Sequence, residues 1–225
     1  MRSATVMAVM VGLACGLSAF GDPIAIFSTG VDSSGSPLTP GTVDSHYALV
    51  SAPSGVTLTA IATSPNGAWT PNTSTADWIS PGSSGGMSFP PGTYDYKTTF
   101  DLTGLDPTTA QLSGKWTSDN NGWIDLNGVM TGVTSVFAGF GSLSSFSITS
   151  GFQPGLNTLD FVIVNGSDSF SPTGVIAEIS GTATASSSVS EPSAVPEPSS
   201  LSMFMLGGGL LGLGGLGRKL ARSRN

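Results

Sequence analysis

Residues 94–102, YDYKTTFDL, decide the fold of this chain. Aromatic and aliphatic side chains occupy alternate positions of the stretch, and mostly Asp, Lys and Thr lie between them. Successive side chains of a β-strand point to opposite faces, so this period of two predicts a strand with one buried and one exposed face. We therefore expect a protein built on β-sheets.

The sequence after this stretch repeats the pattern. Residues 111–117 alternate in the same way, and 123–126 form a further short strand. Residues 118–122, SDNNG, are turn formers. Asn127-Gly128 is a dipeptide favoured in two-residue hairpins, because both residues accept a positive φ.

Other segments complete an all-β domain. Residues 158–165 are apolar apart from Asp160, which predicts a central strand buried on both faces. Further strand candidates are 24–29, 56–63 and 175–182. No segment of the domain shows a 3.6-residue stripe. Short strands joined by Gly, Pro, Asn and Ser turns predict an antiparallel β-sandwich over residues 22–185.

The N-terminus has the three parts of a secretory signal peptide, predicted over residues 1–21. Arg2 provides the positive start, 6–17 the apolar run, and Ala19-Phe20-Gly21 a cleavage site before Asp22. Signal peptidase and the secretion machinery are the partners this implies. The alternatives are a retained anchor helix, or a lipid on Cys15, the single cysteine. With the signal removed, the domain holds no disulfide.

The C-terminus also has distinct parts. Residues 186–195 form a Ser/Pro-rich linker, and Pro196, Glu197 and Pro198 make a stiff, non-helical segment. Residues 199–217 carry no charge, and as a transmembrane helix they would reach roughly 28 Å, close to the ~30 Å of a hydrocarbon core.

A cluster of basic residues follows this apolar segment. Positive residues stay in the cytoplasm, so the cluster would stop transfer with the domain outside. The cluster consists of Arg218, Lys219, Arg222 and Arg224.

The order of proline triplet, apolar segment and basic cluster in residues 196–225 resembles the PEP-CTERM sorting signal of Gram-negative bacteria. The resemblance implies recognition by an exosortase, a membrane protease that would cut near Pro196-Glu197-Pro198. It also implies a precursor tethered to the inner membrane and a final place at the cell surface or in an exopolysaccharide matrix. The alternative is an ordinary C-terminal anchor helix.

Charge and composition exclude several functions. Lys97 and Lys115 are the only Lys or Arg residues between Asp22 and Pro198, whereas all 14 acidic residues lie there, so nucleic-acid binding is not expected. His46 is the single histidine, which excludes multi-histidine metal sites. No nucleotide-binding glycine motif is present. We expect no cofactor and no enzymatic activity; a structural calcium ion is compatible with the many oxygen ligands but has no assigned residues.

Carboxylate pairs leave one catalytic alternative, a small glycoside hydrolase, because that chemistry needs only two acids. Solvated surface is the expectation for these residues. The candidates are Asp95, Asp101, Asp119, Asp125, Asp160 and Glu178.

Aromatic rings beside amides and carboxylates suggest a second function, sugar binding. Ring faces stack on sugars while polar groups bond hydroxyls. The candidate ligand-binding residues are Trp116, Asp119, Asn120, Trp123, Asp125 and Asn127. Trp123, Asp125 and Asn127 should share one face, opposite Ile124 and Leu126. The alternative places Trp116 and Trp123 in the core. Trp69 and Trp78 are expected to pin long loops.

Residues 94–183 also resemble, loosely, the galactose-binding-like jelly roll of many carbohydrate-binding modules. The matching phrases are 99–102 (TFDL), 114–116 (GKW) with Asp119-Asn120, 126–128 (LNG), Phe152 and 155–159 (GLNTL). The resemblance implies a jelly-roll-like sandwich. The sequence thus predicts a non-enzymatic surface or matrix protein, with a carbohydrate-binding module as the alternative.

Overall fold

A computed structural model describes residues 21–166 and 168–186. Nearly all of the predicted signal peptide, the linker from residue 187, the proline triplet, the predicted helix 199–217 and the basic cluster lie outside the described residues. Within them, the one helical segment is the 3₁₀ turn η1 (Gly139–Gly141), and no helix is long and apolar enough to cross a membrane.

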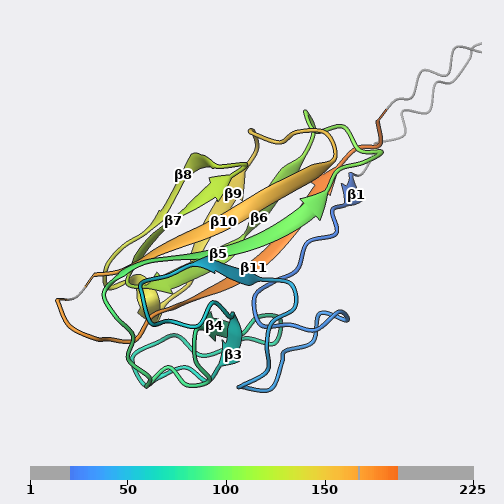
Figure 1. Ribbon diagram of the computed structural model, residues 1–225. Coiled ribbons are helices and arrows are strands. Elements are labelled where there is room, and N and C mark those ends of the chain that lie inside the picture. The colour runs from blue at the N-terminus through green and yellow to red at the C-terminus, as the bar shows by residue number, and fades with distance from the viewer. Residues whose placement is uncertain (1–20, 167, 187–225) are drawn as a thin grey trace, which may run out of the picture. The chain divides into compact units, whose positions relative to one another are not determined.

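Two β-sheets make up the domain (Figure 1). The β11 sheet contains, in spatial order, β3 (Ile61–Thr63), β4 (Trp78–Ser80), β11 (Gly174–Ala183), β6 (Gln111–Asp119) and β9 (Ser144–Ile148), with β1 (Asp22–Pro23) also pairing β11. The β10 sheet contains β2 (Ala48–Ser51), β5 (Gly92–Asp101), β10 (Leu156–Asn165), β7 (Asn121–Leu126) and β8 (Val129–Ser135). All these strand pairs are antiparallel, which confirms the predicted all-β, antiparallel class.

The chain passes repeatedly from one sheet to the other. β5, β6 and β7 alternate between the sheets, as do β8, β9, β10 and β11. β6 ends at Asp119 and β7 begins at Asn121, so the predicted turn over 118–122 is reduced to Asn120. Apart from the pairs β3–β4 and β7–β8, which each stay in one sheet, consecutive strands from β4 onward contribute to opposite sides of one shared core.

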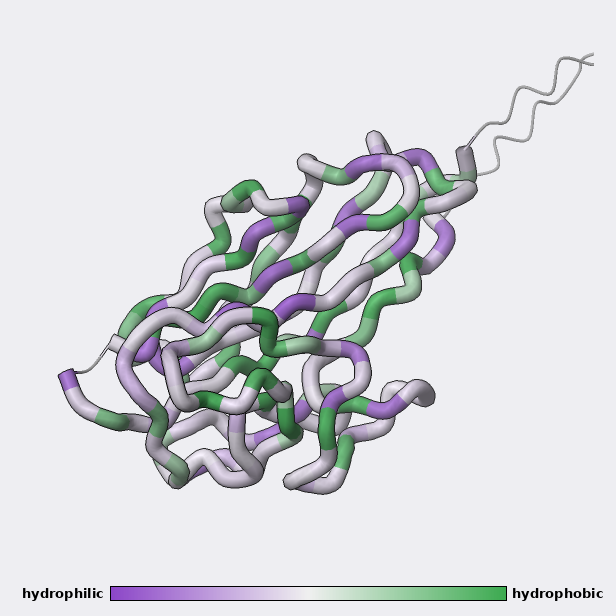
Figure 2. The backbone as a smooth tube through the Cα atoms, viewed as in Figure 1, coloured by the Kyte–Doolittle hydropathy of each residue, from purple (hydrophilic) through white to green (hydrophobic). Residues whose placement is uncertain are grey.

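The core lies between the inner faces of the two sheets. From β5 the side chains of Tyr94, Tyr96 and Phe100 are buried, as the alternation in 94–102 predicts. The Trp116 ring of the β11 sheet packs against Phe161 of the β10 sheet, with 5.6 Å between ring centroids. Figure 2 shows hydrophobic and hydrophilic residues alternating along these strands. The two sheets are thus packed face to face by their apolar sides.

A smaller cluster covers part of the outer side of the β11 sheet. Trp69 and Trp78 stack with ring centroids 4.2 Å apart and pack with Ile176 of β11. Trp78 Nε1 donates to the Thr70 carbonyl. The two tryptophans hold the segment 64–80 on the sheet, as predicted, although Trp78 itself belongs to β4.

Several strand predictions need correction. The strand expected over 56–63 is limited to β3, Ile61–Thr63. Residues 24–29 form no strand although they lie beside β11: the Ile24 amide donates to the Gly181 carbonyl and the Thr29 amide to that of Ala177. The return bonds of a ladder are missing, because the Ala177 and Ile179 amides donate to the Thr29 and Ser28 hydroxyls. β6, β7 and β10 are each two residues longer than predicted.

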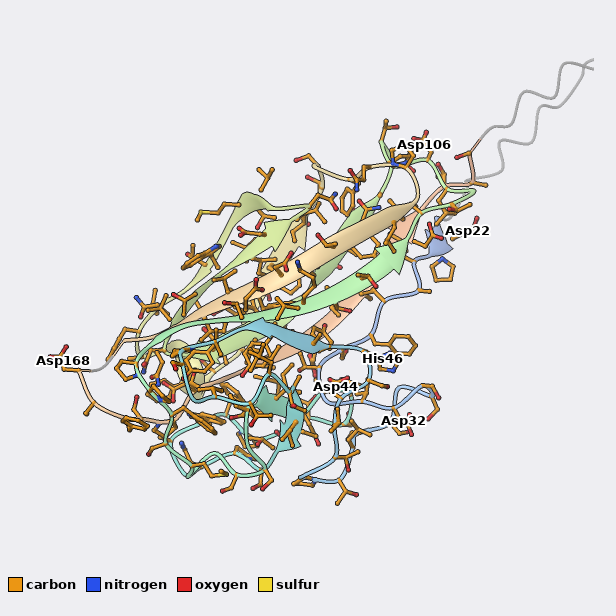
Figure 3. All side chains as sticks on the ribbon, in the orientation of Figure 1. Asp22, Asp32, Asp44, His46, Asp106 and Asp168 are labelled. Atoms are coloured by element: carbon orange, nitrogen blue, oxygen red, sulfur yellow. The ribbon has the colours of Figure 1, made fainter. Side chains whose placement is uncertain are left out.

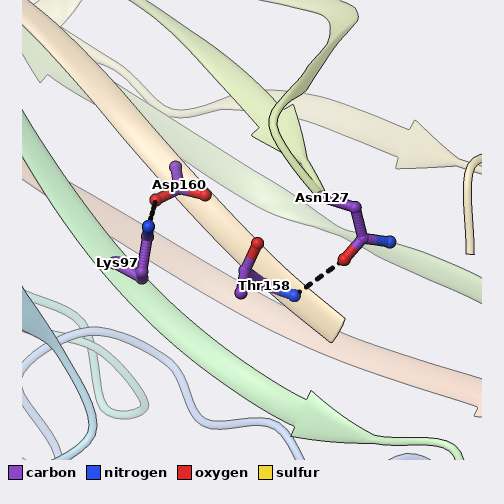
Figure 4. Close-up of polar contacts among 4 residues, drawn as sticks. All are labelled: Lys97, Asn127, Thr158 and Asp160. Carbon is purple, nitrogen blue, oxygen red and sulfur yellow. Dashed lines mark hydrogen bonds and ion pairs between the residues drawn. The ribbon is translucent and has the colours of Figure 1, made fainter. Parts of the chain in front are cut away.

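The Asn127-Gly128 hairpin is confirmed. Asn127 has φ 54° and Gly128 φ 76°, the left-handed values that a two-residue turn of this type requires. β7 and β8 pair on either side of it, with Leu126 opposite Val129. The Asn127 side chain fixes the turn further, because its Oδ1 accepts from the Thr158 amide at 3.0 Å (Figure 4).

Candidate binding surface

The outer face of the β10 sheet brings together five of the polar and aromatic side chains considered above. β5 turns Asp95 and Lys97 outward, and β7 turns Trp123 and Asp125 outward opposite the buried Ile124 and Leu126. Asp160 lies on the strand between them, opposite Lys97 on one side and Asp125 on the other. We call Asp95, Lys97, Trp123, Asp125 and Asp160 the acidic face.

Asp160 is the buried centre of this surface. It is 5% exposed, and its Oδ1 forms an ion pair with the Lys97 Nζ at 3.1 Å (Figure 4). This contact raises the pKa of Lys97. A buried carboxylate needs a compensating charge, and the cation on the adjacent strand supplies it.

The other two carboxylates are less well compensated. Asp95 and Asp125 each hold one buried carboxylate oxygen, Oδ1, without a hydrogen-bond partner in the described part of the chain. Burial, followed by the Asp160 carboxylate, raises the pKa of Asp95 to about 6, and Lys97 offsets only part of this effect. The acidic face therefore contains two carboxylates, each with one buried and unpaired oxygen, beside an aromatic ring.

Trp123 is half-buried on this face, between Val162 of β10 and Thr134 of β8. Side chains alternate along β7, so the Trp123 ring points outward, whereas the neighbouring Ile124 is fully buried in the core. Met130 of β8 lies opposite Asp125 and is 58% exposed. The face thus combines apolar and acceptor groups at neighbouring positions.

The remaining candidates lie elsewhere. Trp116 is 1% exposed in the core, so its ring cannot reach a ligand. Asp119 is also buried: its Oδ2 accepts from Trp69 Nε1 at 2.8 Å, and burial raises its pKa. Asn120 Oδ1 accepts from the Gly166 amide, so this side chain closes the end of β10.

Asn127 is occupied by the hairpin, where its Nδ2 donates to the Gly151 carbonyl and to Asn157 Oδ1. Of the six predicted residues, the acidic face therefore holds only Trp123 and Asp125, while the side chains of Asp119 and Asn120 are hydrogen-bonded to each other elsewhere. The structure adds Asp95, Lys97 and Asp160, which sequence reasoning had not joined to Trp123 and Asp125. The alternation within β5 indicated that Asp95 and Lys97 point outward. It did not indicate that β5 and β7 both pair with β10.

The described residues include no cluster of three or more His, Cys, Asp or Glu side chains that could hold a metal ion. The structural calcium ion remains a prediction without a site.

The fold and this surface define the described part as an all-β domain of two antiparallel sheets with a polar outer face. Comparison with protein families adds a match in the tail: residues 194–224 match the PEP-CTERM protein-sorting motif. The motif implies an exported protein, a membrane-anchored precursor and an exosortase as the processing partner. The proposed resemblance of the tail is thereby confirmed.

A search of curated proteins found no match. Among solved structures, the chain is similar to the CBM36-1 domain of a multidomain xylanase from the hindgut metagenome of Trinervitermes trinervoides, with 12% identity, a TM-score of 0.30, and coverage of 42% of this chain and 74% of that one. It is also similar to an exo-β-1,3-galactanase from Phanerochaete chrysosporium with β-1,3-galactotriose, with 10% identity, a TM-score of 0.25, and coverage of 68% and 29% respectively. Neither similarity is close enough to carry an argument about function.

Proposed function

We propose that this chain is a non-enzymatic surface or exopolysaccharide-matrix protein of a Gram-negative bacterium. Its cargo is a jelly-roll-like β-sandwich, exported by a cleaved signal peptide and delivered by the C-terminal tail. The observation that carries the proposal is the sorting motif at residues 194–224. The absence of cysteine after Cys15 agrees with a domain that relies on its core alone.

The positions of the acidic residues support a non-enzymatic role. Asp101 Oδ1 accepts hydrogen bonds from the Thr103 amide and hydroxyl in a turn, and Asp119 is covered by Trp69. Glu178 belongs to the other sheet. Asp160 is held by its ion pair. A glycoside hydrolase needs two carboxylates flanking one scissile bond. Of the six candidates only Asp95, Asp125 and Asp160 lie together, on the acidic face, and each of these three has a buried carboxylate oxygen.

The sorting role is tested by replacing Pro196, Glu197 and Pro198 with alanine in the producing cell. Without the triplet the exosortase has no cleavage site, so the protein should stay in the inner-membrane fraction. A matched variant with two alanine substitutions in the linker, Ser190→Ala and Ser193→Ala, should reach the surface as the wild type does. Unchanged release of the triplet variant would refute the proposal.

The second candidate function is carbohydrate binding at the acidic face. It is favoured by the half-buried Trp123, which shares this face with the partly exposed Asp95 and Asp125. Substitution of Trp123 by Ala should weaken retention of the full chain by polysaccharide in affinity gels at least about fivefold, because stacking of a ligand ring on one aromatic side chain contributes about 1–3 kcal/mol. Equal retention of Trp123→Ala and wild type would exclude this face as the binding site.

A further inference from the structure

A groove of about 580 Å³ lies on the opposite side of the domain, on the outer side of the β11 sheet. Its floor is formed by outward side chains of β6 and β11, and its wall by the segment 26–35. Figure 3 shows Asp32 on this segment, with Asp44 and His46 nearby. The volume falls within the roughly 300–1,000 Å³ typical of ligand sites.

The floor of the groove presents paired polar groups. Ser113 lies opposite Ser180, and Lys115 lies opposite Glu178. Lys115 is one of two lysines in the domain, and it makes no ion pair with any described residue. Glu178 Oε1 accepts from the Thr75 hydroxyl at 3.0 Å, and its second oxygen has no described partner. The floor thus offers an ammonium donor, a carboxylate acceptor and hydroxyls that do both.

The wall contributes apolar surface. Ile26 and Phe27 line the groove and are half-buried, whereas Val31 is 1% exposed. The Phe27 ring is stacked on the His46 ring with 3.7 Å between centroids and 11° between planes. His46 therefore holds Phe27 in one orientation, and the aromatic surface is in place before a ligand arrives.

Hydrogen bonds fix this wall to the sheet. Asp32 Oδ1 accepts from the Ser34 amide, the Ser34 hydroxyl and the Ser36 amide, which closes a tight turn. Ser28 Oγ accepts from the Ile179 amide at 3.2 Å, and Thr29 Oγ1 accepts from the Ala177 amide at 2.9 Å. A preorganised wall lowers the entropy cost of binding.

We propose that this groove binds a neutral polysaccharide along the β11 sheet. Sugar hydroxyls both donate and accept, which matches Lys115 beside Glu178, and sugar C–H faces match the half-buried Phe27 ring of the wall. Lys115 and Glu178 balance each other, so the floor gives no net attraction to an anionic or cationic chain. The inference rests on the proposed surface role, which brings the domain into contact with extracellular polysaccharide.

Affinity electrophoresis of the full chain in mild detergent tests the inference. Native gels contain, separately, a glucan, a galactan, a xylan, a mannan, the exopolysaccharide of the producing cell, and alginate as the anionic comparison. At least one of the first five should retard the wild type. Lys115→Ala and Ser113→Tyr should reduce that retardation about tenfold or more, the first by removing a charge-assisted donor and the second by filling the floor. Gln111→Ala, on the same face of β6 but outside the groove, should behave as the wild type.

Three outcomes would overturn the inference: no retardation by any of the five polysaccharides, undiminished retardation of both groove variants, or loss of retardation only in Trp123→Ala. The last outcome would leave the acidic face as the binding site. Circular dichroism spectra identical to that of the wild type would show that the variants are folded. The assay measures polysaccharide binding by purified protein, so its result does not depend on whether the protein is sorted in the cell. A negative binding result and a negative sorting result can therefore be told apart.

Discussion

Tyr94 and Tyr96 both point into the core from β5, but they differ in whether the hydroxyl group has a hydrogen-bond partner. Tyr94 OH donates to the Pro90 carbonyl at 2.7 Å, whereas Tyr96 OH is buried without a partner among the described residues. An unsatisfied buried hydroxyl costs free energy, and its removal can be neutral or stabilising.

We therefore predict opposite results for two matched substitutions. Tyr94→Phe should lower the free energy of unfolding by about 1 kcal/mol, and Tyr96→Phe should leave it unchanged or raise it. Urea denaturation of the two variants and the wild type measures the difference. An equal loss in both variants would contradict the burial of an unpaired hydroxyl at Tyr96.

Asp95 makes stability depend on pH. Its pKa is about 6 in the folded state, compared with 3.8 for an ordinary aspartate, which represents the unfolded state. Between these two pH values the folded state therefore binds more protons than the unfolded state. Stability should therefore fall as the pH rises from about 4 to about 6. Burial raises the pKa of Asp77 to about 6 as well, and this group acts in the same direction.

Asp95→Asn should remove part of this dependence. We expect the melting temperature of the variant at pH 7 to exceed that of the wild type and to change less between pH 4.5 and pH 7. The residual slope should shrink further when Asp77→Asn is added. Thermal denaturation at both pH values provides the measurement, and a wild type that becomes more stable from pH 4.5 to pH 7 would contradict the assignment.

At the scale of the strands, β6 and β11 approach unusually closely at Gly114. A Cβ placed on Gly114 would lie 1.9 Å from the Glu178 carbonyl oxygen. The obstacle is backbone in the middle of a sheet, which cannot move without disrupting the pairing of Ile179 with Gly114.

Gly114→Ala should therefore lower the free energy of unfolding by about 2–3 kcal/mol, at the upper end of overpacking effects. Ser113→Ala on the same strand, whose side chain points to solvent, should change it by less than about 0.5 kcal/mol. Equilibrium denaturation compares the two. A mild effect at Gly114 would mean that the two strands are farther apart than described.

The burial of each strand explains whether it could be predicted from the sequence. β5, β6, β7 and β11 were predicted because one face of each is buried, and this imposes a period of two. β8 was not predicted, because it is an edge strand whose side chains are mostly exposed: Val129 is 70% exposed and Met130 58% exposed. β2 and β4 contain only four and three residues, too few for a periodic pattern.

The candidate surface was predictable only within a strand. The alternation around Ile124 placed Trp123 and Asp125 together, and that of β6 placed Trp116 with the buried Leu112. The neighbours of Trp123 across the sheet, Asp95 and Asp160, depend on which strands pair and in which register. One sequence does not contain that information, because many registers satisfy the same alternation.

For the whole molecule, both ends of the described domain meet at one end of the β11 sheet. Asp22 pairs with Ala183, and the Asp106 amide donates to the Thr184 carbonyl. Figure 3 places Asp22 and Asp106 at this end and Asp168 at the other. The predicted signal cleavage site and the start of the linker are therefore attached at the same end of the domain.

The central claim is that this β-sheet domain is exported and loses both terminal segments, the signal peptide and the sorting tail, by proteolysis. The most direct test is the intact mass of the protein recovered from the surface of the producing cell. The account predicts a chain that begins at Asp22 and ends near Pro198, without the basic cluster of residues 218–224. A surface protein that still carries Asn225, or a cytosolic protein that still carries residues 1–21, would contradict it.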